Sequence, residues 1–254
     1  MTQSWPELVT QVGALPPPPQ LLLFGDSITQ GATSLQNELT KRFMRRLDVI
    51  NRGFGGYNTN SGLVLLPSFF PAVAPSKTVP RVAALTIHFG ANDSCSPGEP
   101  QHCDLDTYRA NIKRVLHWQG VRLHKTKVIL VTPAPVEEYR LPHDGKGRAD
   151  RISSYAQVIR DIGKEEGVPV VDLWTAMMRK TGWKEGNEGV LPGSLSAPPA
   201  MELGRLFNDG LHFTQEGYEI YTEELLRVLE REVPECREGT EPWYSQWDQF
   251  HPGK

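Results

Sequence analysis

Residues 21–31 of this chain read Leu21-Leu22-Leu23-Phe24-Gly25-Asp26-Ser27-Ile28-Thr29-Gln30-Gly31. The apolar run has the length of a buried strand, and the glycine, acid and serine that follow it indicate a tight turn into a helix. In an open α/β sheet, side chains at the carboxyl end of a strand face the crevice where ligands bind. Ser27 is therefore a candidate nucleophile. The alternative is that Asp26 or Ser27 simply caps the next helix.

On either side of this stretch, short apolar runs alternate with helical periodicity. The predicted strands cover about 20–24, 48–51, 81–89, 127–131 and 168–172. The predicted helices cover about 35–47, 63–66, 105–124, 149–166, 174–178 and 214–231, the last of them with Thr214 as a plain N-cap. Strands that are each followed by helical material predict an α/β fold, with a five-stranded parallel sheet between two helix layers. The crevice should lie at the carboxyl ends of the strands.

Length and composition indicate a single globular domain. The chain has 254 residues and no low-complexity linker, so we expect one domain over 1–254, with an N-terminal arm at 1–19 and an aromatic C-terminal tail at 233–254. A net charge of −3 gives no general attraction to nucleic acid. No stretch approaches the roughly 18 apolar residues of a membrane span, and residues 1–20 lack the pattern of a signal peptide. These features predict a cytoplasmic protein.

The cysteines and one basic cluster are the other features of the sequence that could form a site. Three cysteines cannot all pair, so Cys95, Cys103 and Cys236 are predicted to be free thiols, with a Cys95–Cys103 disulfide as the alternative. His102 beside Cys103 does not have the ligand spacing of a zinc site, and we expect no metal. The basic cluster at residues 41–46 is predicted to be a solvated helix face, with a phosphate site as the alternative.

Three of the predicted strands end in turns that could serve a serine hydrolase. The first ends at Ser27, the second at Gly55-Gly56 and the third at Asn92. A serine nucleophile needs donors directed at the oxyanion that forms, and Gly56 allows a substrate to approach its backbone N–H closely. The Asn92 amide and the Ser27 N–H are the other candidate donors. The alternative is that the glycines and Asn92 only form turns.

The candidate base lies directly before the last predicted helix. Asp209 and His212 are three residues apart with Gly210 between them, so a tight turn can bring the carboxylate against one imidazole nitrogen. The other nitrogen is then free to face Ser27, as a serine triad requires. The remaining histidines are less suitable, because His88 lies in a predicted buried strand and the others lie on a helix or in loops.

These blocks, in this order, resemble the four sequence blocks of the GDSL or SGNH hydrolases. They are Gly25-Asp26-Ser27, Gly56 within 51–59, Gly90-Ala91-Asn92-Asp93 and Asp209-Gly210-Leu211-His212. Together they span about 21–230. Within the family the chain is similar to the isoamyl-acetate-hydrolysing esterase branch. That branch usually has a serine where this chain has Gly55, a difference that bears on substrate preference more than on chemistry.

The resemblance implies a flavodoxin-like three-layer α/β/α sandwich and hydrolysis of small carboxylic esters without metal or cofactor. By motif, Ser27 is the nucleophile, His212 the general base and then acid, and Asp209 its orienting partner. The oxyanion hole is formed by the Ser27 N–H, the Gly56 N–H and the Asn92 amide. Asp26 and Asp93 are expected to be structural and to hold their turns through backbone N–H groups.

Several questions stay open at the level of sequence. The favoured function is a short-chain carboxylesterase acting on small-molecule, acetate-type esters through an acyl-enzyme. An acyltransferase, a carbohydrate deacetylase and a non-catalytic binding module are the alternatives. The loops 134–150 and 182–199 are expected to wall the crevice, while Trp183, Leu191 and Leu195 are expected mainly to pack on the surface. The tail aromatics at positions 243, 244, 247 and 250 are expected to dock on the domain, with a second subunit as the alternative. The branch favours a homodimer.

Overall fold

Five strands form one parallel sheet, in which the order of the strands differs from their order in the sequence. The structure, a computed structural model, describes residues 16–141, 147–186 and 189–244. The sheet order is β2-β1-β3-β4-β5. This is the order of a flavodoxin-like doubly wound fold, in which the chain reverses direction across the sheet at β1. The strands are β1 (Gln20–Gly25), β2 (Asp48–Gly53), β3 (Val82–His88), β4 (Lys127–Val131) and β5 (Val170–Val171).

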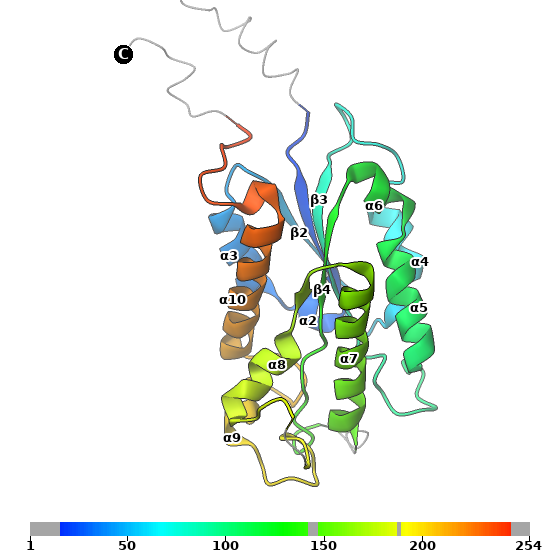
Figure 1. The fold of residues 1–254 in the computed structure, drawn as a ribbon, viewed down its shortest axis with the longest axis vertical. Helices are drawn as coiled ribbons and strands as arrows, with labels where there is room; N and C mark the ends of the chain where they lie inside the picture. Colours follow the sequence, from blue (N-terminus) through cyan, green and yellow to red (C-terminus); the bar gives the residue numbers. More distant parts are fainter. Residues whose placement is uncertain (1–15, 142–146, 187–188, 245–254) are drawn as a thin grey trace, which may run out of the picture.

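Helices cover both faces of the sheet, as Figure 1 shows. One layer contains α3 (Thr33–Arg42), α8 (Leu173–Met178) and α10 (Gln215–Glu232), and the other contains α4 (Thr59–Phe69), α5 (Leu105–Leu116), α6 (Gln119–His124) and α7 (Arg148–Glu166). The short helices α2 (Ser27–Gln30) and α9 (Met201–Gly204) lie in connecting segments. The predicted three-layer α/β/α architecture is confirmed.

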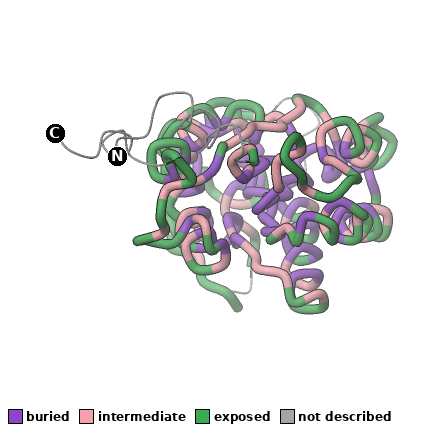
Figure 2. Tube along the Cα trace, turned by 90° about the horizontal axis from the view of Figure 1, so that it is seen from above, coloured by how far each residue is buried: buried purple, intermediate pink, exposed green. Residues whose placement is uncertain are grey.

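Alternating strand side chains fill the two layers between sheet and helices. On β1, Leu21 and Leu23 pack in the cluster with α3, α8 and α10, whereas Leu22 and Phe24 pack in the cluster with α4, α5 and α7. Successive side chains of a strand point to opposite faces, so a strand that is buried on both faces must be apolar throughout. Figure 2 shows the buried stretches gathered in the middle of the molecule and the exposed turns around them.

Three predicted elements differ from those observed. The helix predicted over 35–47 ends at Arg42, so Arg45 and Arg46 lie in the turn that follows it and not on a helix face. The helix predicted over 105–124 is two helices, because Trp118 has extended backbone angles and Gly120 packs against Phe70. The strand predicted over 168–172 pairs with β4 through only two residues, Val170 and Val171.

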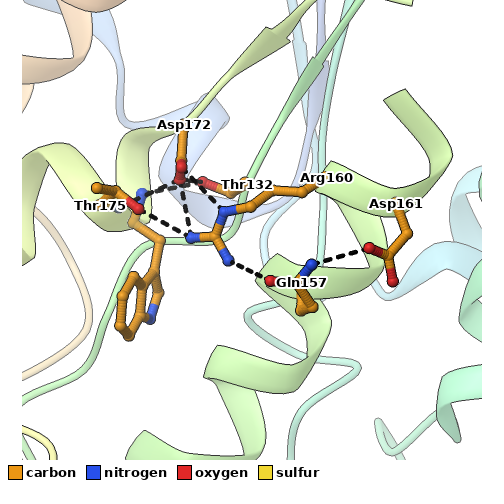
Figure 3. Close-up of polar contacts among 7 residues, drawn as sticks. Thr132, Gln157, Arg160, Asp161, Asp172 and Thr175 are labelled. Atoms are coloured by element: carbon orange, nitrogen blue, oxygen red, sulfur yellow. Dashed lines mark hydrogen bonds and ion pairs between the residues drawn. The ribbon is translucent and has the colours of Figure 1, made fainter. Parts of the chain in front are cut away.

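A polar cluster fixes the edge strand β5 between α7 and α8 (Figure 3). Arg160 donates from Nε to Asp172 Oδ2 at 2.9 Å and from Nη2 to Asp172 Oδ1 at 3.0 Å. Asp172 also caps α8 by accepting from the Thr175 N–H. Burial would raise the pKa of Asp172, but the bonds from Arg160 and Thr175 outweigh burial and lower it. The two-residue strand is therefore held by side chains as well as by its ladder.

The two ends of the described chain lie together at the amino end of the sheet. The Trp243 indole N–H donates to Pro16 O at 3.1 Å, and the Trp243 backbone N–H donates to Arg45 O at 2.6 Å. The predicted docking of the tail is confirmed for Trp243, while Trp247 and Phe250 lie outside the described residues. No helix in the described segments combines the length and the hydropathy that a membrane crossing requires.

We expect Gly163→Ala in α7 to lower the free energy of unfolding by about 1–3 kcal/mol. Alanine normally stabilises a helix relative to glycine. Here, however, the added Cβ would lie 2.2 Å from Val170 Cγ2 and 3.0 Å from Val168 O. Urea denaturation measures the change, with Ser154→Ala on the exposed face of the same helix as the control. A Gly163→Ala variant more stable than wild type would contradict the close contact of α7 with β5.

Candidate active site

Ser27 lies at the first turn after β1. Asp26 is the N-cap of α2 and accepts the Ile28 N–H at 2.9 Å, and Ser27 is the first helical residue. The turn needs a glycine at Gly25, because a Cβ there would lie 2.4 Å from His88 O on the neighbouring strand. Ser27 is thus fixed between the buried strand β1, which ends two residues before it, and the helix α2, which it begins. The capping expected of Asp26 is confirmed.

The Ser27 hydroxyl faces a histidine that lies 185 positions away in the sequence. Ser27 Oγ is 3.0 Å from His212 Nε2, and His212 Nδ1 is 2.7 Å from Asp209 Oδ2. The second carboxylate oxygen, Asp209 Oδ1, accepts the backbone N–H groups of Leu211 and His212. The His212 side chain is 44% exposed, so the three groups are open to a ligand in solution. The structure thus brings together the three residues predicted to form a triad.

The loop that carries Asp209 and His212 is closed at its base. Phe207 and Phe213 form an antiparallel bridge beneath it, and both are buried. At its tip Gly210 has φ +87°, and its carbonyl accepts the Glu137 N–H at 2.9 Å. A Cβ on Gly210 would lie 2.3 Å from Glu137 O, so only glycine fits. The loop is therefore seated against the segment that follows β4.

Helix α10 connects this loop to the helix of Ser27. Tyr218 lies one turn into α10, and its hydroxyl donates to Ile28 O at 2.8 Å. Its ring also packs against Phe213 at the base of the loop, with ring centroids 5.2 Å apart. Tyr218 thus contacts both sides of the Ser27–His212 pair. The position of each side is fixed relative to the other through a packed aromatic residue.

The other predicted donors lie on the loops after β2 and β3. The Phe54 N–H donates to Gly25 O at 2.9 Å, which brings the Gly55-Gly56 turn beside the start of α2. Gly56 has φ +78°. Asn92 is buried, and its Nδ2 donates to Tyr57 O at 2.8 Å, so one amide hydrogen is used and the amide plane is fixed. Ser27, Gly56 and Asn92 therefore follow three adjacent strands and sit on neighbouring loops.

Asp93 is structural and accepts a backbone N–H, as expected, but this N–H belongs to the neighbouring loop. Its Oδ1 accepts the Thr59 N–H at 3.0 Å and the Thr59 hydroxyl at 2.6 Å. Thr59 begins α4, directly after the loop that contains Gly56. Asp93 therefore ties the loop after β3 to the loop after β2.

The acidic groups of the site have opposite electrostatic environments. Burial would raise the pKa of Asp209, but the bonds from the His212 ring and from the His212 and Leu211 N–H groups outweigh burial and lower it. At Asp26, burial raises the pKa to about 7, and the nearby Asp93 adds to this effect while the Ile28 N–H opposes it. Burial likewise raises the pKa of Asp93 to about 6. The pKa of Asp209, the carboxyl group bonded to His212, is thus lowered, whereas the pKa values of Asp26 and Asp93 are raised.

Other predicted residues have structural roles. His88 is buried in β3, and burial lowers its pKa to about 3, so it remains neutral. Trp183 packs edge-on against Trp174, and Leu191 packs against the same core cluster, as expected of surface packing. Leu195 is largely exposed. The three cysteines are buried and none forms a disulfide, as predicted.

Two residues of the site were not found from the sequence. Gln30 Oε1 accepts the Gly55 N–H at 2.6 Å, and Gln101 Nε2 donates to Gly56 O at 2.7 Å. Hydrophobic periodicity does not report hydrogen bonds between a side chain and a distant loop. The only available signal was the position of Gln30 at the end of the 21–31 stretch.

The chain is similar to known esterases. The model of the GDSL-like Lipase/Acylhydrolase family matches residues 23–220. The human isoamyl acetate-hydrolyzing esterase 1 homolog is 32% identical over 230 residues, which cover 85% of this chain and 83% of the relative. The lipase/acylhydrolase of Enterococcus faecalis has a TM-score of 0.59 at 26% identity, over 85% of this chain and 98% of that chain. An acetylxylan esterase of Geobacillus stearothermophilus has the same fold, with a TM-score of 0.59 at 19% identity over 92% and 99% of the chains.

We expect Asp26→Asn to weaken the dependence of stability on pH. The raised pKa means that the folded chain holds the Asp26 proton between about pH 4 and 7 while the unfolded chain releases it. The free energy of unfolding therefore falls as pH rises through this window, by up to about 1.4 kcal/mol per pH unit for each such group. The substitution removes the Asp26 contribution but keeps an oxygen for the Ile28 N–H.

Urea denaturation at pH 5, 6, 7 and 8 measures the effect. The difference in unfolding free energy between pH 5 and 8 should be smaller for Asp26→Asn than for wild type. Equal pH dependence in both proteins would show that Asp26 has an ordinary pKa in the fold.

Proposed function

Because the chain belongs to the GDSL-like lipase/acylhydrolase family and is a carboxylic ester hydrolase, we propose that it hydrolyses short-chain, acetate-type esters through an acyl-enzyme on Ser27. The observation that carries this proposal is the continuous chain of hydrogen-bond distances from Ser27 Oγ through His212 to Asp209. The name of the human relative, isoamyl acetate-hydrolyzing esterase 1 homolog, supports acetate esters as the substrate class.

In the proposed cycle, His212 Nε2 removes the Ser27 proton as Oγ attacks the ester carbonyl. The resulting imidazolium gives this proton to the departing alcohol, and the acyl group stays on Ser27. His212 then activates a water molecule, which releases the carboxylic acid and restores the serine. The 3.0 Å separation of Ser27 Oγ and His212 Nε2 is within the range for such a proton transfer.

Asp209 is proposed to hold the imidazole in the tautomer that this cycle needs. One of its oxygens accepts two backbone N–H groups, so the other is left to accept the Nδ1–H of His212. With the proton fixed on Nδ1, Nε2 carries the lone pair that faces Ser27. The lowered pKa of Asp209 keeps the carboxylate charged, and a charged partner stabilises the imidazolium when it forms.

The Ser27 N–H, the Gly56 N–H and the Asn92 amide are proposed to bind the oxyanion. Asn92 donates one amide hydrogen to Tyr57 O, so its second amide hydrogen can be directed at the substrate. The buried position of Asn92 makes this hydrogen a stronger donor than it would be in water. Loss of one donor of this kind costs about 10²- to 10³-fold in rate.

We also propose a cytoplasmic location. None of Cys95, Cys103 and Cys236 forms a disulfide. Cysteines outside disulfides suit a reducing compartment, in which disulfides do not persist.

Hydrolysis of p-nitrophenyl esters from acetate to decanoate tests the proposal. We expect wild type to be most active on the shortest acyl groups and Ser27→Ala to lose activity by a factor of about 10³ or more. Ser154→Ala, which removes an exposed hydroxyl on α7, is the matched control and should retain full activity.

Activity that survives in Ser27→Ala would refute the assignment of the nucleophile. A preference for long acyl chains would refute the substrate class. Faster release of p-nitrophenol on adding an alcohol or a sugar, together with a transesterified product, would favour acyl transfer over hydrolysis.

Asp209→Asn should reduce kcat about 10⁴-fold with little change in KM. The amide oxygen would take the place of Oδ1 and accept the two backbone N–H groups, so the amide nitrogen would face His212 Nδ1. Neutral His212 would then carry its proton on Nε2 and could not accept the Ser27 proton. Steady-state kinetics with p-nitrophenyl acetate measure the loss, with exposed Asp106→Asn in α5 as the control. Near-normal kcat in Asp209→Asn would contradict the role of Asp209.

A further inference from the structure

The peptide group between Gly55 and Gly56 has unusual rotational freedom. It carries the Gly56 N–H, one of the proposed oxyanion donors, on one side and the Gly55 carbonyl on the other. Because neither residue has a Cβ, steric hindrance does little to prevent this peptide from rotating about its flanking bonds. The two glycines also leave the backbone on either side of this peptide flexible, so the position of the donor depends on what holds the neighbouring peptide groups.

Gln30 holds the peptide group that precedes the Gly55–Gly56 peptide. Its Oε1 accepts the Gly55 N–H at 2.6 Å. Gln30 ends α2, the helix that begins at Ser27, and its own N–H is bonded to Asp26 O. It also lies tightly against the end of β2, where a Cβ on Gly53 would come within 2.0 Å of the Gln30 nitrogen. The donor loop is thus tied to the helix that carries the nucleophile.

Gln101 holds the peptide group that follows the Gly55–Gly56 peptide. Its Nε2 donates to Gly56 O at 2.7 Å. The backbone of Gln101 is fixed in turn, because its carbonyl accepts from Asn58 Nδ2 at 2.9 Å. Gln101 lies in the segment that follows Asn92 and Asp93, so this bond ties the donor loop to the loop after β3. A Cβ on Gly56 would come 3.2 Å from Gln101 Nε2, which leaves little spare room there.

We propose that Gln30 and Gln101 are positioning residues that direct the Gly56 N–H at the oxyanion, an inference that rests on the proposed function. The two side chains fix the peptide groups on either side of the Gly55–Gly56 peptide, one through an N–H and the other through a carbonyl. With both neighbouring peptide groups held, the Cα atoms of Gly55 and Gly56 stay in place, so the Gly56 N–H keeps a set position relative to Ser27 at the start of α2. Neither glutamine needs to touch the substrate.

Isosteric substitutions give an asymmetric test. Gln30 acts as an acceptor, and Gln30→Glu keeps an acceptor for the Gly55 N–H. Gln101 acts as a donor, and Gln101→Glu places a carboxylate oxygen against Gly56 O, where no bond can form. The same chemical change should therefore be tolerated at one position and harmful at the other.

The experiment compares Gln30→Ala, Gln30→Glu, Gln101→Ala and Gln101→Glu with wild type on p-nitrophenyl acetate at 0.15 M salt, where exposed charges are screened. We expect kcat to fall about 5- to 50-fold in both alanine variants and in Gln101→Glu, with KM changed by less than about twofold. Gln30→Glu should stay within about threefold of wild type. Gln157→Ala, on the exposed face of α7, is the matched control.

Inhibition by a trifluoromethyl ketone separates positioning from a general loss of structure. This compound forms a tetrahedral adduct with a serine and so carries an oxyanion of its own. Its inhibition constant should rise in the same proportion as kcat/KM falls, while the midpoint of urea denaturation stays near that of wild type. Should an alanine variant fail to fold, the two isosteric variants still decide the outcome.

Three results would overturn the inference: unchanged kcat in all four variants, a rise in KM at constant kcat, or equal damage from Glu at both positions. Ser27→Ala, assayed in parallel, distinguishes failure of this inference about Gln30 and Gln101 from failure of the proposed function. If Ser27→Ala is inactive while the glutamine variants keep kcat, only the role of Gln30 and Gln101 is refuted. If Ser27→Ala remains active, the proposed function itself fails.

Discussion

The pairing of β1 between β2 and β3 is the constraint on which the site depends. Gly25, the last residue of β1, pairs with Gly53 at the end of β2 and with His88 at the end of β3. Three strands that end in register deliver their following loops to one edge of the sheet. These loops carry Ser27, Gly56 and Asn92. A shift of register by one residue would move these loops relative to one another, so the pairing of β1 also sets the geometry of the site.

Hydrogen bonds between loops then convert this shared edge into a defined geometry. Asp93 joins the loop after β3 to the start of α4, Asn92 is held by Tyr57, and Tyr218 joins α10 to α2. One of these bonds involves a buried carboxyl group, that of Asp93. Burying a carboxyl group is costly, and burial raises the pKa of both Asp93 and Asp26, which lie where the loops of the site meet.

Much of this arrangement was predictable from the sequence, for physical reasons. The strands at 21–24 and 82–87 are apolar on both faces, and the polar residues at their ends could only meet at one edge. The Asp209–His212 spacing is local, so a turn could be inferred directly. The division of the 105–124 helix was not predictable, because it depends on Gly120 packing against Phe70 from another layer. The roles of Gln30 and Gln101 were equally hidden, since each bonds to backbone 25 or 45 positions away.

The central claim is that Ser27 becomes covalently acylated with the help of His212. Mass spectrometry after reaction with a fluorophosphonate ester, which phosphonylates activated serines, tests it most directly. The account predicts one adduct per chain, located on the peptide that contains Ser27, with loss of activity in proportion to labelling. Ser27→Ala should give no adduct, and His212→Ala should label far more slowly. An adduct on another residue, or an active enzyme that resists labelling, would contradict the account.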